Sequence, residues 1–226
     1  MNESEGKEIA FFGKITAGIT HEMKNVLAVI KESSGLMEDI MSLSPDALIS
    51  YQEKFQTSLN KIKNQIERGI KLTDMLNKFA HSPDETIAKI DLQEIIEQFI
   101  ALSQRFARLK NVELKAASQK HTGRQATLVT RPIQLQMALF AALECCLNAM
   151  SGGGVIHIGH DKITEKYNVH VLCEGDLSVR SEFLDKLSAF EKWPLLQHIT
   201  AFLQGSAKLD ESAHGIVISI PEELRA

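Results

Sequence analysis

A histidine, a glutamate and an asparagine stand close together in the stretch HEMKN, at residues 21–25. A neutral imidazole near its reference pKa is a competent nucleophile at physiological pH, and a neighbouring carboxylate can orient one ring nitrogen while the other attacks. His21 and Glu22 therefore have the residue types for group transfer to a histidine, and Asn25 follows one helical turn later. A solvated histidine can also be idle, so the spacing permits this chemistry without proving it.

Helical geometry indicates which way these side chains point. At about 100° per residue, one apolar seam spans roughly 80° of the helix surface. The seam consists of Phe12, Ile15, Ile19, Met23, Val26 and Ile30. His21 falls about 160° from the seam centre, Asn25 about 40° further round, and Glu22 about 100° from the histidine. We therefore expect His21 to face solvent and Glu22 to lie near the edge of the seam.

Two long helices are expected to position this motif. The first apolar-periodic segment runs from about Glu8 to Met41, and a second helix starts at Ser44 and Pro45, which suit a cap and a first helical position. Its seam ends before Pro83 and comprises Phe55, Leu59, Ile62, Ile66, Ile70, Leu76 and Phe79. Because two helices cannot cover both of their own apolar stripes, we expect residues 8–82 to form a four-helix bundle in a homodimer.

The pattern changes after Pro83, and residues 86–226 are expected to form a second, mixed α/β domain. A helix capped by Asp91 should turn Ile95, Ile96, Phe99 and Leu102 inward. Further helices are predicted near residues 132–150, 182–190 and 194–203, and strands near 112–116, 126–129, 155–159, 168–173, 206–209 and 215–220. The expected fold class is α+β, with helices on one face of a mainly antiparallel sheet.

Bulk properties exclude several classes of protein. The chain has 226 residues, 44% of them hydrophobic, which is ample for a core. The net charge of −4, without a Lys/Arg-rich run, argues against nucleic-acid or anionic-membrane partners. The sequence contains neither a membrane-spanning apolar run nor a signal-peptide layout, so we expect a cytoplasmic protein.

The cysteines and histidines do not suggest a metal centre. Cys145 and Cys146 are adjacent, so on a helix they point in different directions, and they and Cys173 are expected to be buried free thiols. The eight histidines lack the spacing of metal ligands. No metalloprotein is implied.

The segment GKITAGITHEMKNVLAVI resembles the H-box of sensor histidine kinases of two-component signalling, and LQMALFAALECCLNAM resembles their N-box. The resemblance covers nearly the whole chain. It implies a dimerising phosphoacceptor hairpin followed by an ATPase-type domain. His21 matches the phosphoacceptor, Glu22 its acid/base neighbour, and Asn25 the position that in many relatives orients a hydrolytic water. The usual proline after the asparagine is Val26 here, so the helix should be straighter.

The resemblance also assigns a nucleotide site. Asn148 matches the asparagine that coordinates the magnesium of ATP, and Glu144, one turn earlier, matches a general base of some relatives. The Asp-x-Gly-x-Gly box departs from the pattern, because VHVLCEGDLSVR has Cys173 in the aspartate position, Gly175 for the first glycine and Leu177 for the second. A one-residue slip would offer Glu174 or Asp176 but would spoil the strand alternation.

The lid region departs from the family pattern as well. LSAFEKWPLLQHITAFLQG has no glycine before Gly205, whereas relatives cradle the phosphates with a Gly-rich box there. The resemblance therefore implies a degenerate pocket in which Gly175, Glu144 and Asn148 are vestigial. ATP and magnesium would be cofactors only if this divergent pocket is competent.

Three functions remain open from the sequence. The first is a histidine phosphotransferase or phosphatase-like protein, similar to those derived from kinases, that exchanges a phosphoryl group between His21 and an aspartate of a response-regulator receiver domain. The second is an ATP-dependent histidine kinase with a divergent pocket, which would need a separate sensor protein because no sensory segment precedes Glu8. The third is a non-enzymatic dimeric scaffold, in which His21 would be dispensable.

Overall fold

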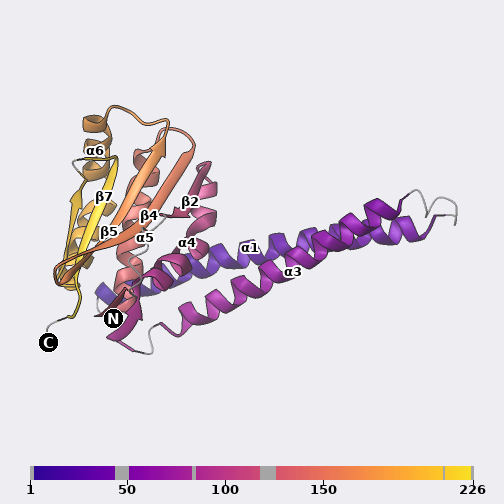
Figure 1. The fold of residues 1–226 in the computed structure, drawn as a ribbon, viewed down its shortest axis with the longest axis horizontal. Coiled ribbons are helices and arrows are strands. Elements are labelled where there is room, and N and C mark those ends of the chain that lie inside the picture. The colour runs from indigo at the N-terminus through magenta and orange to yellow at the C-terminus, as the bar shows by residue number, and fades with distance from the viewer. Residues whose placement is uncertain (1–2, 44–50, 83–84, 118–125, 211, 225–226) are drawn as a thin grey trace.

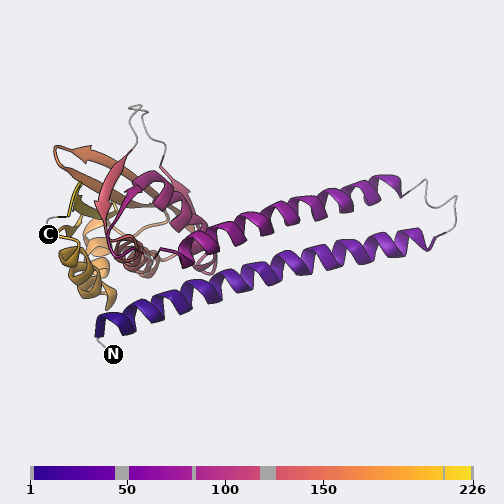
Figure 2. The same ribbon diagram turned by 90° about the horizontal axis from the view of Figure 1, so that it is seen from below.

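A long helical hairpin projects from a compact α/β domain (Figure 1). The computed structural model describes residues 3–43, 51–82, 85–117, 126–210 and 212–224. Helix α1 (Glu3–Met41) and helix α3 (Gln52–Ala80) run side by side in opposite directions, as both views show (Figure 2). The hairpin is the one predicted, although α1 begins earlier than Glu8, and the predicted start of the second helix at Ser44 and Pro45 lies outside the described residues.

Half of the predicted seam of α1 is buried. Ile15, Ile19 and Val26 have almost no exposed surface, while Phe12, Met23 and Ile30 are only partly buried. On α3 the buried positions are Ser58, Gly69, Leu72 and Phe79. A Cβ added at Gly69 would lie 3.4 Å from a methyl group of Val26, an ordinary van der Waals distance, so Gly69 faces α1.

Two residues of the predicted α3 seam are not buried against α1. Ile66 and Ile70 are exposed, because they lie on the side of the helix that does not face α1. Ile9 and Leu27 are exposed on α1 as well. The packing inside one chain therefore leaves large apolar side chains of the hairpin in contact with solvent.

The α/β domain begins with strand β1 (Ala88–Asp91), which was not predicted and pairs antiparallel with β3 (Thr127–Thr130). Helix α4 (Leu92–Arg108) follows directly. The Asp91 carboxylate caps this helix, accepting hydrogen bonds from the backbone nitrogens of Gln93 at 2.8 Å and Glu94 at 3.4 Å. The predicted cap is therefore confirmed.

The main sheet has the strand order β2-β4-β5-β7-β6. These strands are β2 (Val112–Ala116), β4 (Gly154–Ile163), β5 (Lys166–Gly175), β6 (Ser206–Leu209) and β7 (Gly215–Pro221). The pairing of β2 with β4 is parallel and the other three pairings are antiparallel. The predicted α+β class with a mainly antiparallel sheet is confirmed.

Helix α5 (Pro132–Ala149) lies at the centre of the domain, and most of its side chains are buried. It packs against α6 (Arg180–Ala189) and α7 (Lys192–Phe202), and also against α4. The helices lie on one side of the sheet (Figure 2). Within the described ranges, no helix is long and apolar enough to cross a membrane.

Candidate functional site

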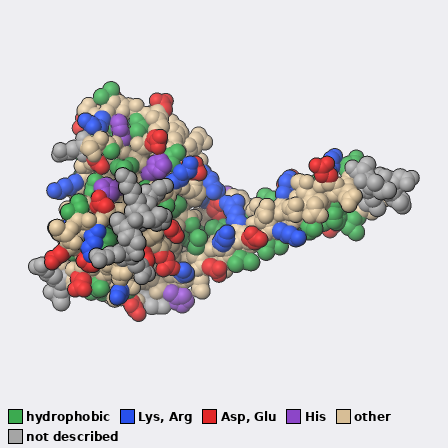
Figure 3. All heavy atoms as spheres, viewed as in Figure 1, with side chains coloured by type: hydrophobic (Ala, Val, Ile, Leu, Met, Phe, Trp, Pro, Cys, Tyr) green, Lys and Arg blue, Asp and Glu red, His purple; other side chains and the backbone are tan. Residues whose placement is uncertain are grey.

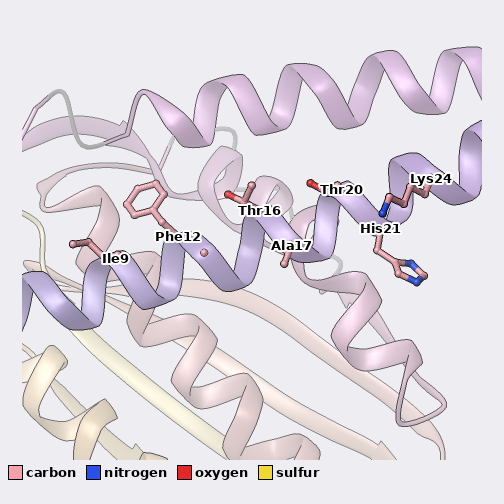
Figure 4. A pocket seen from close by; sticks show the side chains of 8 residues that line it. Ile9, Phe12, Thr16, Ala17, Thr20, His21 and Lys24 are labelled. Carbon is pink, nitrogen blue, oxygen red and sulfur yellow. The ribbon is translucent and has the colours of Figure 1, made fainter.

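His21 lies on the outer surface of α1, as predicted. It is exposed and lines one end of an open hollow of about 800 Å³ along this helix. The other lining residues also come from α1 and are mainly small or apolar: Ile9, Phe12, Gly13, Thr16, Ala17, Thr20 and Lys24. The imidazole ring projects away from the helix (Figure 4). A large partner can therefore reach the ring from solvent.

Asn25 lies beside the imidazole, one turn further along α1. Its Nδ2 is 3.4 Å from Nδ1 of His21. When the amide donates to Nδ1, the ring proton sits on Nε2. If the amide turns so that Oδ1 accepts from a protonated Nδ1, the electron pair of Nε2 becomes free to attack. Asn25 can therefore bind either tautomer of the ring.

Glu22 points into the junction between the hairpin and the α/β domain. Its carboxylate is 12% exposed and accepts hydrogen bonds from Arg68 of α3 and Arg108 of α4, the latter at 3.2 Å. Adjacent residues of a helix do not face each other, so this direction differs from that of the His21 ring. The structure brings Asn25 to the imidazole and places the Glu22 carboxylate on the two arginines.

Cys173 occupies the position at which the resemblance expects an adenine-binding aspartate. It is buried and hydrogen-bonded to Cys146 of α5. The hydrogen bond with Cys173, together with burial, raises the pKa of the Cys146 thiol well above its usual range. All three cysteines are buried free thiols, as predicted. The thiol of Cys173, paired with that of Cys146, thus stands where a carboxylate would be needed to bind the adenine amino group.

Glu144, Asn148 and Gly175, the other positions of the expected nucleotide site, have different surroundings. Glu144 accepts from Lys14 of α1 in an ion pair that joins the hairpin to the α/β domain. Asn148, in the last turn of α5, is exposed. Gly175 has φ +141°, and a side chain there would meet the carbonyl oxygen of Gly153 at 2.8 Å. This close approach of two backbone segments requires a glycine without reference to a nucleotide.

Sequence reasoning missed the cations of this junction. Lys14, Arg68 and Arg108 come from three different helices, and each meets its carboxylate across a large sequence separation. Short-range periodicity contains no signal for such pairs. Within the described ranges, no group of three His, Cys, Asp or Glu side chains could hold a metal ion.

Comparisons with known proteins give matches among solved structures alone. No protein-family model and no curated protein sequence matches the chain. The histidine kinase AdeS of Acinetobacter baumannii is similar in structure, with a TM-score of 0.45 and 12% identity over 89% of this chain and 98% of that one. The catalytic domain of histidine kinase ThkA has a TM-score of 0.48 and 16% identity, over 62% of this chain and 100% of that one.

A third similar structure is ThkA in complex with the response regulator protein TrrA. Its TM-score is 0.44 with 18% identity, over 95% of this chain and 63% of that one. Each of these three structures contains a histidine kinase. At these identities the likeness is one of fold.

Proposed function

We propose that this protein is a histidine phosphotransfer protein of two-component signalling, in which His21 exchanges a phosphoryl group with an aspartate of a response-regulator receiver domain. The observation that carries the proposal is the exposed imidazole of His21, which has Asn25 at its Nδ1 and an open hollow beside it. A receiver must bring its own aspartate to the imidazole, which requires this access. The resemblance to the H-box gives the same assignment.

The α/β domain supports transfer from a receiver over phosphorylation by ATP. Two buried thiols, those of Cys146 and Cys173, stand where the carboxylate that binds adenine is expected. Glu144 already forms an ion pair with Lys14. A pocket without the carboxylate loses hydrogen bonds that determine nucleotide selectivity. We propose that this domain supports the hairpin instead of delivering ATP to His21.

The hairpin supports assembly into a homodimer. Leu27, Ile66 and Ile70 are large apolar side chains that their own chain leaves exposed. A second hairpin packed on these faces would bury them in a four-helix bundle. We propose a homodimer with one His21 on each protomer.

One observation favours an ATP-dependent kinase as a second candidate. Asn148 is exposed at the end of α5, where the side chain of a magnesium ligand must be reachable. The thiols at Cys146 and Cys173 argue against adenine binding at the same site. The kinase reading therefore needs a nucleotide bound without that carboxylate.

One comparison tests the proposal. The protein is incubated with a receiver domain labelled at its phosphoaspartate and, separately, with labelled ATP and magnesium. Label from the receiver on wild-type protein, with no label on His21→Gln, is the expected result, and His198→Gln is a matched control because His198 is exposed on α7. Label from ATP would favour the kinase. Equal uptake of receiver label by wild type and His21→Gln would refute the proposal.

A further inference from the structure

Glu22 is bound at the meeting point of three helices. Arg68 of α3 and Arg108 of α4 both donate to the same carboxylate oxygen, Oε2. The side chains of Arg68 and Arg108 are 39% and 54% exposed, against 12% for Glu22. The carboxylate is therefore the inner member of the cluster and the arginines form its outer side. Figure 3 shows Lys and Arg side chains gathered where the hairpin meets the α/β domain.

The cluster binds the α/β domain to the residue next to His21. Hydrogen bonds between ionised partners are shorter and stronger than neutral ones, and a largely buried carboxylate is less screened than one on the surface. Arg108 belongs to the last turn of α4, so its contact crosses from the α/β domain to the hairpin. The cluster borders a cavity of about 210 Å³ that Lys71 and Gln104 also line. This space allows the side chains to rearrange.

The proposed reaction requires the proton of the neutral His21 ring to be on Nδ1. The electron pair of Nε2 attacks the phosphorus of the receiver's phosphoaspartate, so the N–P bond forms while the bond from phosphorus to the carboxyl oxygen breaks. That bond's electrons stay on the released aspartate carboxylate. The phosphohistidine keeps its proton on Nδ1, and an anionic acceptor there stabilises both the attacking tautomer and the positive charge that develops on the ring.

Asn25 can offer only a neutral amide oxygen to this proton, whereas a carboxylate would stabilise the developing charge better. Glu22 is the adjacent carboxylate, but the arginines hold it at the junction. We propose that Arg68 and Arg108 are positioning residues that keep Glu22 in a resting arrangement, and that fast transfer at His21 requires the Glu22 carboxylate to leave Arg108 and accept from Nδ1. This inference rests on the proposed function of His21. Through Arg108, the α/β domain would then control the transfer rate.

The test removes the interdomain cation. Arg108→Gln should raise the rate of transfer from a phosphorylated receiver roughly five-fold, the factor that corresponds to one partly exposed ion pair. In a Glu22→Gln background, the same substitution should leave the rate unchanged. Arg105→Gln is a matched control, because Arg105 also lies in the last turn of α4.

A second measurement separates positioning from simple loss of structure. Nitrogen NMR of the His21 ring should show more of the Nδ1-protonated tautomer in Arg108→Gln than in wild type, with no such gain in the double variant. An unchanged or slower transfer rate in Arg108→Gln would overturn the inference, as would an equal rise in the Glu22→Gln background. If His21→Gln still takes up label, the proposed function itself fails. If labelling requires His21 but its rate is the same in Arg108→Gln as in wild type, only the present inference fails.

Discussion

Lys14 of α1 forms an ion pair with Glu144 of α5, which ties the helix that carries His21 to the central helix of the α/β domain. The Lys14 nitrogen also lies 4.8 Å from the centre of the Phe140 ring. Beneath it, Phe11 packs edge-on against both Phe79 and Phe140, at ring distances of 5.6 Å. This ion pair and the aromatic packing, together with the Glu22–Arg108 pair, join the two parts of the chain.

We predict that Phe79→Ala destabilises the protein strongly. Phe79 is 1% exposed and contacts Phe11 and Phe12, so its truncation leaves a cavity between α1 and α3. Truncation of a buried phenylalanine typically costs about 3–5 kcal/mol. Chemical denaturation measures this change. Phe202→Ala, at an exposed position, should cost much less, and equal losses for the two variants would contradict the packing described here.

Nucleotide binding is predicted to be very weak. Cys173 contacts Cys146 in place of the adenine-binding carboxylate. Cys173→Asp should destabilise the fold without restoring ATP affinity, because its carboxylate would be buried beside a thiol and not beside a base. Calorimetry with ATP and magnesium tests both proteins. Micromolar affinity in the wild type would overturn this prediction and promote the kinase reading.

Asn148→Ala provides a separate test of the vestigial site. Asn148 is exposed, so its replacement should change neither thermal stability nor receiver-dependent labelling of His21. Loss of labelling from the receiver would show that this side chain has a role that the proposed transfer does not assign to it.

The dimer prediction concerns apolar residues that face away from the chain's own core. Ile66→Lys and Ile70→Lys should dissociate the homodimer while the monomer stays folded, because both positions are exposed in one chain. Ile19→Lys should instead unfold the protein, since Ile19 is fully buried. Sedimentation and circular dichroism distinguish these results. Asn64→Lys, at an exposed position about 160° around α3 from Ile66, is the matched control.

Most helices and strands could be predicted because their signals are local. The period of apolar residues located α1 and α3, and the carboxylate of Asp91 marked the start of α4. Strand β1 was missed because its four residues, AKID, gain their strand conformation by pairing with β3, far along the chain. The partners of Glu22 were unpredictable for the same reason, since Arg68 and Arg108 come from other helices.

An acid-dependent loss of stability is predicted at His160. Burial lowers the pKa of this histidine below its ordinary value. As the pH falls below about 6.5, the unfolded chain binds a proton that the folded chain does not, so the free energy of unfolding decreases. His160→Gln should reduce this decrease between about pH 7.5 and about pH 5.5, as measured by denaturation. His198→Gln, at an exposed position, should leave the slope as in the wild type.

Asn25 is predicted to act after the phosphoryl group has arrived at the site. Its amide lies 3.4 Å from Nδ1 of His21, one turn along the same exposed face. From there the amide can hold a water against a phosphoryl group on a docked receiver. The amide is not a nucleophile, so it does not accept the phosphoryl group itself. Asn25→Ala should therefore spare transfer to His21 and slow the loss of phosphate from the receiver.

Two time courses measure these effects: label on His21 and inorganic phosphate released from the labelled receiver. Lys31→Ala is a suitable control, because Lys31 is exposed on the same helix and does not line the hollow beside His21. If Asn25→Ala slowed transfer as severely as His21→Gln while release continued at the wild-type rate, Asn25 would be needed to orient the ring. Its role would then be in the attack itself, and the water-binding assignment would be wrong.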